Sequence, residues 1–250
     1  MSRIYSSAED NQKPKIDKLA VNTFFSLRAR RINSLGAVQA VIYQDKHPEL
    51  AMRRDLAEKE KLLPQLYMNG TQRILDVGCG TGRWVKDLLP VCSYYHGIDS
   101  CASFIDYAKE NFSHDKKANF TTAAIEDFSL KKLRENLPFD RVLCCGVMIY
   151  LNDQEVRDAV SCMASVLHEK EGILLCREPI GIDHRLTVLN HYSDEMEQTY
   201  NAIYRTENEL ISFLCNDGYF RVIEIGFVYD DSSLNNRSDT IQKYFLLEKL

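Results

Sequence analysis

The sequence predicts an α/β protein with a doubly wound, mostly parallel sheet that follows a helical segment. Two observations predict this class. From about residue 71, short apolar segments alternate with segments of helical spacing, and a glycine-rich turn follows the first apolar segment. This alternation is typical of parallel strands that helices cover on both faces of a sheet.

Residues 1–70 have a different pattern, because no convincing strand stands out before the alternation begins. Apolar side chains recur at near-helical spacing from Ile16 to about Leu63, and Pro64 ends the pattern. We interpret residues 1–70 as a helical lid or cap. Residues 71–250 then form the sheet-containing domain, with an insertion at about residues 180–205.

Seven strands are expected in this domain, and the last two follow the insertion. The expected strands are Arg73–Val77, Tyr95–Ile98, Asn119–Ala123, Phe139–Cys145, Gly172–Arg177, Phe220–Val228 and Ile241–Glu248. The main expected helices are Gly82–Leu89, Ala102–Asn111, Asp153–Leu167 and Glu207–Cys215. Residues 180–205 are polar, aromatic and helix-like, so we expect a helical insertion over one end of the sheet.

Composition and charge narrow the class of protein further. The chain has 250 residues and a formal net charge of -5, which disfavours a broad nucleic-acid interface. No apolar run approaches the roughly 18 residues of a membrane span, and the N-terminus lacks the apolar stretch of a secretory signal. Eight cysteines include the adjacent Cys144 and Cys145 but no Cys-x-x-Cys pair. We predict reduced thiols, a cytoplasmic location, no nucleic-acid partner and no membrane span.

The most informative motif is ILDVGCGTGRW, residues 74–84. An apolar strand ends at Val77, and Gly78, Gly80 and Gly82 then allow a tight turn in which the backbone approaches a ligand closely. A loop without a ligand is the alternative. The strand before the turn and the helix after it favour a nucleotide-like ligand at the carboxyl end of the strand.

Acidic residues follow the next two strands. Asp99, beside Ser100, lies 21 residues beyond Gly78, where a carboxylate can accept hydrogen bonds from both hydroxyls of a ribose. Glu126 and Asp127 follow the third strand, and Asp127 is a candidate to bind an exocyclic amine. Helix capping is the alternative role for both aspartates.

The end of the glycine motif separates two ligand classes. Dinucleotide sites usually read Gly-x-Gly-x-x-Gly or Ala, whereas Arg83 occupies the last position here. Asp76 inside the strand is also unlike a dinucleotide strand, so a nicotinamide-dependent oxidoreductase is disfavoured. The chain instead resembles the class I S-adenosylmethionine-dependent methyltransferases over about residues 71–250. The resemblance lies in LDVGCGTGRW, GIDS, IEDF and FDRVLCCGVMIYLND.

This resemblance implies a Rossmann-like, seven-stranded sheet with an antiparallel last strand. It also implies S-adenosylmethionine as cofactor and S-adenosylhomocysteine as product. Asp99 would hold the ribose and Asp127 the adenine amine. The residues that would surround the methionine part, or organise the turn beside it, are Asp76, Gly78, Cys79, Gly80, Cys145 and Gly146.

Part of the front segment resembles the lid of small-molecule methyltransferases. Tyr43 is a candidate to contact the cofactor carboxylate, with Arg53 or Arg54 as a charge partner. The alternative is that both arginines form ion pairs on a solvated helix face.

Catalytic residues are expected to be few, because methyl transfer depends largely on alignment and exclusion of water. Tyr150 stands where many relatives carry histidine, and could face the acceptor or serve only in packing. Glu178 follows the fifth strand and would point toward the active end. His184 and His191 are seven residues apart and would share a helical face, where either could act as a base. Their spacing matches no strong metal-ligand pattern, so no metal is predicted.

These observations favour a methyltransferase that acts on an oxygen or nitrogen of a small molecule or sugar unit. The lid and the insertion carry this expectation, because together they would cover a small acceptor. A peptide or glycan terminus is the alternative acceptor, and a non-catalytic binding module is less favoured. The oligomeric state stays open.

Overall fold

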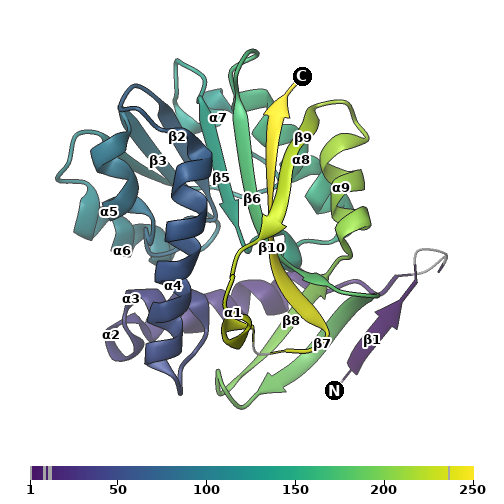
Figure 1. The fold of residues 1–250 in the computed structure, drawn as a ribbon. Helices are drawn as coiled ribbons and strands as arrows, with labels where there is room; N and C mark the ends of the chain where they lie inside the picture. Colours follow the sequence, from purple (N-terminus) through teal and green to yellow (C-terminus); the bar gives the residue numbers. More distant parts are fainter. Residues whose placement is uncertain (1, 8–9, 11–12, 236) are drawn as a thin grey trace.

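The central element of the fold is a sheet of seven strands. The computed structural model describes residues 2–7, 10, 13–235 and 237–250. The sheet has the order β4-β3-β2-β5-β6-β10-β9, and β10 is antiparallel to both of its neighbours while the other pairs are parallel (Figure 1). Its strands are β2 (Arg73–Val77), β3 (Tyr94–Asp99), β4 (Ala118–Thr122), β5 (Arg141–Cys145), β6 (Ile173–Gly181), β9 (Phe220–Phe227) and β10 (Thr240–Lys249). This arrangement confirms the predicted Rossmann-like sheet with its antiparallel last strand.

Helices cover both faces of this sheet, which is why the inner strands β2 and β5 are almost wholly buried and mainly apolar. One hydrophobic cluster joins the sheet to α8 and α9, and a second joins it to α4, α5 and α6. Capping boxes begin α8 at Asn152 and α9 at Thr206. These helices are α5 (Val85–Leu88), α6 (Ala102–Phe112), α8 (Asp153–Val166) and α9 (Glu207–Cys215), and the short α7 covers Leu130–Leu133.

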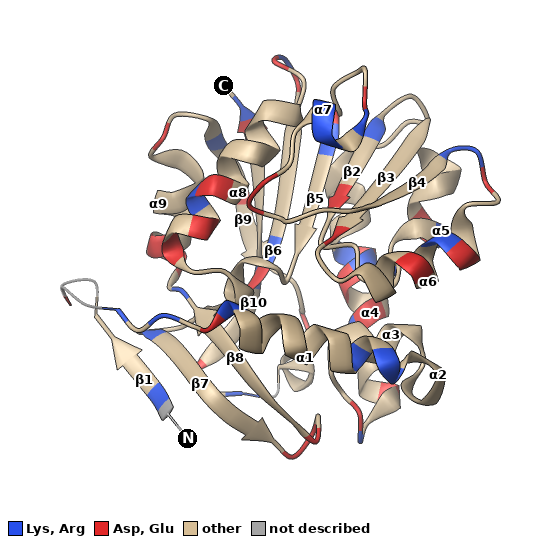
Figure 2. Ribbon diagram, turned by 180° about the vertical axis from the view of Figure 1, so that it is seen from behind, with Lys and Arg blue, Asp and Glu red and all other residues tan. Residues whose placement is uncertain are grey.

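The first three N-terminal helices lie at the end of the sheet where the parallel strands finish, and the fourth runs from there along one face of the sheet (Figure 1). They are α1 (Lys18–Arg30), α2 (Ile32–Leu35), α3 (Ala37–Ile42) and α4 (Pro48–Leu62). In Figure 2, α1 lies beneath the carboxyl ends of these strands. The helical interpretation of this part of the chain therefore agrees with the structure. Single-turn 3-10 helices cover Leu63–Leu66, Leu89–Val91, Met148–Tyr150 and Ser232–Leu234.

The prediction of a helical insertion at residues 180–205 was wrong. The segment forms an antiparallel hairpin of β7 (Arg185–Ser193) and β8 (Gln198–Tyr204), and β1 (Ser2–Ser6), a strand the sequence pattern did not predict, pairs with β7. The physical reason is that the apolar residues of this segment recur at every second position, as in a strand. Leu186 and Val188 of β7, with Tyr200 and Ala202 of β8, alternate with other residues and pack in one cluster with Phe24 of α1.

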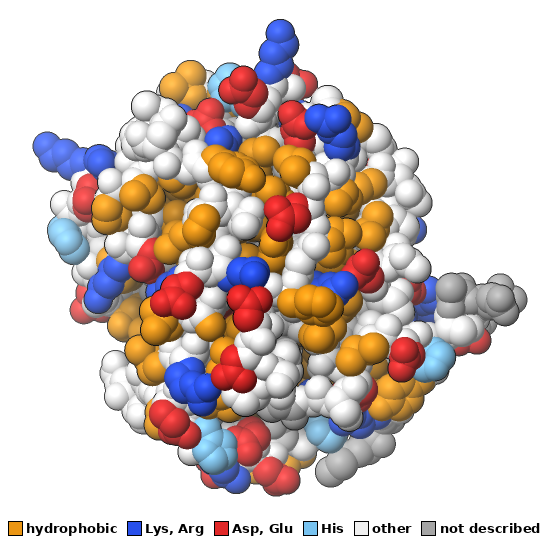
Figure 3. All heavy atoms as spheres, viewed as in Figure 1, with side chains coloured by type: hydrophobic (Ala, Val, Ile, Leu, Met, Phe, Trp, Pro, Cys, Tyr) orange, Lys and Arg blue, Asp and Glu red, His pale blue; other side chains and the backbone are white. Residues whose placement is uncertain are grey.

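The surface carries charges of both signs. On the face drawn in Figure 3, basic and acidic side chains are interspersed with small apolar patches. That face therefore offers no continuous basic surface of the kind that tracks a nucleic-acid backbone. Within the described ranges, no helix is long and apolar enough to span a membrane.

Candidate active site

The glycine-rich turn after β2 has a backbone that only glycine accommodates easily. Gly78, Gly80 and Gly82 have φ values of 74°, 54° and 78°. A Cβ on Gly78 would lie 2.3 Å from Cγ2 of Val147, in the loop after β5. The backbone N–H groups of Gly78 and Cys79 both donate to the carbonyl of Ile98, at 2.8 and 2.9 Å. The turn is thus fixed between the ends of three adjacent strands.

Asp99 at the end of β3 holds this turn from the other side. Its Oδ2 accepts a hydrogen bond from the N–H of Gly80 at 2.9 Å, and its Oδ1 accepts one from the N–H of Cys101 at 2.8 Å. Burial raises the pKa of Asp99 to about 6, against the opposing effect of these two N–H groups. Each oxygen keeps a further lone pair for a ligand hydroxyl, so the ribose role and a local capping role are compatible.

Asp76 is the most deeply buried carboxyl group at the turn. It is 1% exposed, and the Tyr95 hydroxyl donates a hydrogen bond to its Oδ2 at 2.6 Å. Burial raises its pKa to about 7, while the Tyr95 hydroxyl acts in the opposite direction. A carboxyl group with this pKa is poised to ionise when a cationic ligand group approaches.

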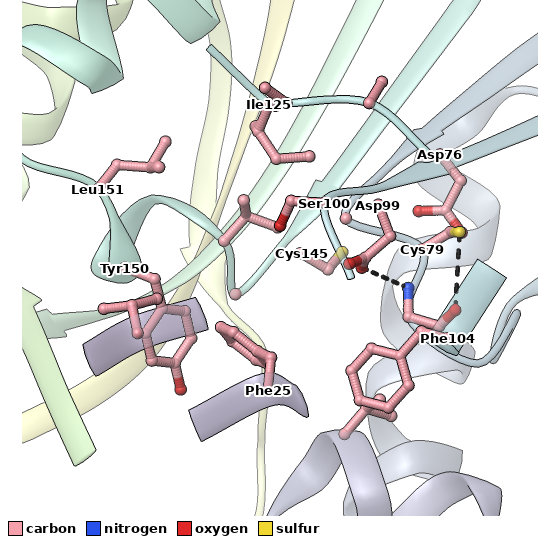
Figure 4. A pocket seen from close by; sticks show the side chains of 18 of the residues that line it. Phe25, Asp76, Cys79, Asp99, Ser100, Phe104, Ile125, Cys145, Tyr150 and Leu151 are labelled. Carbon is pink, nitrogen blue, oxygen red and sulfur yellow. Dashed lines mark hydrogen bonds between the residues drawn. The ribbon is translucent and has the colours of Figure 1, made fainter. Parts of the chain in front are cut away.

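A cavity of about 340 Å³ opens beside these residues (Figure 4). Its walls also include α1 and the loop after β5, whose Phe25 and Tyr150 rings meet edge to face with centroids 4.9 Å apart. The wall therefore joins parts of the chain that are far apart in sequence. The predicted site residues that line this cavity are Tyr43, Asp76, Gly78, Cys79, Gly80, Asp99, Ser100, Glu126, Cys145, Gly146 and Tyr150.

Two predicted cofactor residues lie elsewhere. Asp127 is exposed and pairs with Lys132 outside the cavity lining, since the chain turns so that its neighbour Glu126 faces the cavity. Arg53 is exposed on α4 and pairs with Asp231 at 3.0 Å, in agreement with the alternative of a solvated, ion-paired face.

Two predicted catalytic residues also lie outside this cavity. Glu178 is 1% exposed and accepts hydrogen bonds from the backbone N–H groups of Val147 and Met148, at 2.8 and 2.9 Å. It therefore fixes the loop after β5, and burial raises its pKa. His184 is exposed between β6 and β7. Because residues 185–193 form a strand, His184 and His191 do not share a helical face.

A second cavity of about 170 Å³ lies next to the first. The α4 helix, the β7–β8 hairpin and the segment between β9 and β10 contribute to its walls. The residues that line both cavities are Val41, Tyr43, Cys145, Gly146, Tyr150 and Arg177. A ligand in one cavity would thus be separated from a ligand in the other only by these shared side chains and backbone groups.

A buried ion-pair network borders both cavities. Arg83 donates to Asp55 and Glu58 of α4, each at 2.7 Å, and Arg177 donates to Glu58 at 2.9 Å. Although burial opposes ionisation of Glu58, Arg177 and Arg83 hold its pKa below its usual value. The network ties α4 to the glycine-rich turn and to β6. The sequence did not predict these contacts of Asp55 and Glu58, because helical spacing alone does not show which neighbour covers a helix.

Several wall residues carry no signal in the sequence that could have assigned them to the site. Phe25 and Asn22 of α1 line the first cavity, and Tyr200 and Arg237 line the second. Only the tertiary arrangement brings them to the strand ends. In the described part of the chain, no group of three or more His, Cys, Asp or Glu side chains could hold a metal ion.

Known proteins with similar sequence or fold include methyltransferases. Residues 74–170 match the model of a methyltransferase domain. A search of curated proteins found no match. Among solved structures, phosphoethanolamine N-methyltransferase 1 from Haemonchus contortus, in complex with phosphoethanolamine and S-adenosylhomocysteine, is 17% identical with a TM-score of 0.69. That match covers 92% of this chain and 49% of the other, so the chain spans about half the length of this neighbour.

Two further structures share the fold over most of both chains. A Leishmania major S-adenosylmethionine-dependent methyltransferase is 18% identical with a TM-score of 0.63, covering 90% of this chain and 83% of the other. The [4+2]-cyclase SpnF is 14% identical with a TM-score of 0.65, covering 94% and 98%. Residues 74–170 are thus similar to a methyltransferase domain, and the chain shares its fold with these structures.

Proposed function

We propose that this chain is a class I S-adenosylmethionine-dependent methyltransferase that releases S-adenosylhomocysteine. We propose further that it methylates an oxygen or nitrogen of a small molecule or sugar unit that binds in the second cavity. The observation that carries the proposal is the shared wall, where Tyr43, Gly146 and Tyr150 face both cavities. A donor in the first cavity and an acceptor in the second would meet there. The volume of about 170 Å³ suits a small acceptor or the end of a larger one.

We assign the first cavity to the cofactor because its groups fit the parts of S-adenosylmethionine. Asp99 offers free lone pairs to the ribose hydroxyls, and at neutral pH its pKa of about 6 leaves it mostly ionised. The turn at Gly78 to Gly80 presents backbone close to the methionine part, and Asp76 lies within reach of a cationic group there. Ile125 and Phe104 supply apolar surface for the adenine.

S-adenosylmethionine supplies an electrophilic methyl group, so the protein must align the acceptor and exclude water. Phe25 of α1 and Tyr150 provide the cover, and we propose that the N-terminal helices act as a lid. Burial raises the pKa of Tyr43 to about 12, and it raises that of Tyr150 well above its usual value. Both hydroxyls therefore stay protonated and serve to orient the acceptor by hydrogen bonds. Tyr150 is thus our candidate for the residue in contact with the acceptor.

The test is methyl transfer from labelled S-adenosylmethionine to a panel of amines, hydroxy acids, sugars and sugar phosphates. We expect product with at least one small acceptor, formation of S-adenosylhomocysteine in equal amount, and loss of both in Asp99→Ala. Binding of S-adenosylmethionine without transfer to any small acceptor, combined with transfer to peptide or glycan ends, would contradict the small-molecule assignment. Failure to bind either S-adenosylmethionine or S-adenosylhomocysteine would contradict the assignment of the first cavity.

A further inference from the structure

We propose that the methyl acceptor carries an anionic group, a carboxylate or a phosphate, and that Arg237 and Tyr200 bind this group in the second cavity. The inference rests on the proposed function, because it takes the second cavity as the acceptor site. It adds the chemical class of the acceptor and the residues that select it.

The first argument is an unused donor on Arg237. Its Nη2 donates to the Tyr200 hydroxyl at 2.8 Å, and its guanidinium carbon lies 5.8 Å from the centre of the Tyr200 ring and 5.9 Å from that of Tyr204. Its Nη1 is buried and has no hydrogen-bond partner among the residues that the structure describes. A buried N–H group without a partner is costly, and an anion in the cavity would satisfy it.

The second argument is the balance of charge along the cavity wall. Three guanidinium groups line it, those of Arg54, Arg177 and Arg237, against the carboxylates of Glu58 and Glu195. Glu58 is already neutralised by ion pairs with Arg177 and Arg83. Arg54 donates two N–H groups to the backbone carbonyl of Leu234 and has no carboxylate partner in the described part of the chain. The wall therefore keeps positive charge for a ligand.

Glu195, in the turn between β7 and β8, adds a second requirement. Its Oε2 is buried and has no partner among the described residues, and its Oε1 lies 3.9 Å from Nε2 of His47. A carboxylate repels an anion, so the anion binds on the Arg237 side, while Glu195 accepts a hydrogen bond from a hydroxyl or ammonium group of the same acceptor. Hydroxy acids, amino acids and phosphate esters of small alcohols or sugars meet both requirements.

The position of Arg237 also orients the acceptor. Arg237 and Tyr200 line the second cavity but not the first, whereas Tyr43, Gly146 and Tyr150 line both. An anion held by Arg237 would fix the non-reacting end of the acceptor and leave its nucleophilic end at the shared wall. Binding energy from a remote charged group would then align the reacting atoms.

The decisive experiment measures anion binding without turnover. The full chain, saturated with S-adenosylhomocysteine, is titrated calorimetrically with inorganic phosphate and separately with malonate at constant ionic strength. We expect at least one of the two to bind, and to bind at least tenfold more weakly to Arg237→Gln. The matched control is Arg221→Gln, which removes an exposed arginine that pairs with Glu248 far from the cavity and should bind like wild type.

Tyr200→Phe keeps the ring but removes the hydroxyl that holds Arg237, and it decides the question if Arg237→Gln does not fold. We expect at least threefold weaker anion binding in Tyr200→Phe, with unchanged affinity for S-adenosylhomocysteine. The proposal is overturned if neither anion binds wild type, or if the folded variants bind the anions as wild type does. Failure of the wild-type chain to bind S-adenosylhomocysteine would instead contradict the proposed function.

Matched acceptors then distinguish the two anion sources. Methyl transfer is compared among glucose, glucuronate and glucose 6-phosphate, and between ethanolamine and phosphoethanolamine. We expect one anionic member to exceed its neutral partner at least tenfold in kcat/KM, with Arg237→Gln removing this advantage mainly through KM. Preference for the carboxylate or the phosphate identifies the source. Equal or better use of the neutral partners would overturn the anionic acceptor and leave the methyltransferase assignment intact.

Discussion

The two cavities are built in different ways. The first lies against the turn after β2 and the end of β3, and much of its polar surface comes from one glycine-rich turn and the aspartate 21 residues after it. The second collects side chains from α4, β8, β10 and the segment before β10. The first cavity depends on backbone geometry, so a short motif predicts it, whereas the side chains of the second cavity come from distant parts of the sequence.

The substitution with the largest expected effect tests whether the first cavity depends on the backbone geometry of the glycine-rich turn. Gly78→Ala places a Cβ at positive φ and 2.3 Å from Val147. Strain and collision together cost about 3 to 4 kcal/mol of stability. If the turn moves to relieve a cost of this size, binding of S-adenosylmethionine should weaken roughly 100-fold or more. Calorimetry and urea unfolding measure both effects.

Gly218→Ala is a matched control, because Gly218 has a φ of 75° but no atom within 4 Å of the added Cβ. We expect about 1 kcal/mol of destabilisation from the positive φ alone and wild-type affinity for S-adenosylmethionine. Equal effects of the two substitutions on cofactor binding would show that the close approach at Gly78 is unimportant.

The next effect separates two aspartates that the sequence pattern treats alike. Asp99→Ala should weaken binding of S-adenosylmethionine by about 1.5 to 3 kcal/mol, because a hydrogen-bonded carboxylate is lost at the cavity. Asp127→Ala should leave affinity unchanged, because Asp127 is exposed and pairs with Lys132. Calorimetric titration of both variants tests this difference. A comparable loss of affinity in Asp127→Ala would support the original prediction that Asp127 binds the adenine.

The third prediction concerns the pH dependence of the free energy of unfolding. Burial raises the pKa of Asp76 to about 7 in the folded chain, so the folded state binds a proton more tightly than the unfolded state does. Its contribution to stability is therefore fully present below the ordinary pKa of aspartate and is lost as pH rises through 7.

Asp76→Asn removes the charge that burial disfavours. We expect this variant to exceed wild type in free energy of unfolding by about 1 to 3 kcal/mol at pH 8, and by much less at pH 4. Urea unfolding without cofactor at both pH values measures the difference. A constant difference across this range would exclude ionisation of Asp76 as its cause.

The smallest effect concerns His184, which is exposed outside both cavities. His184→Ala should change stability by no more than about 0.5 kcal/mol and leave turnover unchanged. Glu178→Gln is the comparison, because it weakens a buried acceptor of backbone N–H groups and should cost about 1 to 3 kcal/mol of stability. A pH-dependent decrease in kcat for either variant, with unchanged stability, would support the prediction that the substituted residue acts as a catalytic base.

The same contrast explains what the sequence could predict. Parallel strands covered on both faces appear as mainly apolar segments, and the turn at Gly78 needs glycine, so the sheet and much of the lining of the first cavity were predictable. The hairpin of β7 and β8 was not, because its apolar, polar and aromatic residues suit a helix as well as a strand until Leu186 and Val188 are seen to share one face. Asp127 and Arg53 lie outside the cavities because adjacent residues of a loop or helix point in different directions, and their neighbours Glu126 and Arg54 face a cavity instead.

Pairing of β1 with β7 also has a consequence for how the chain is made. Ser6 pairs with Arg185, so a strand near the start of the chain waits for a partner that is translated about 180 residues later. At roughly 5 to 20 residues per second, this interval lasts about 10 to 40 seconds on the ribosome. The antiparallel sheet beside the second cavity is therefore among the late structures of the nascent chain, because β1 has no β7 to pair with during that time.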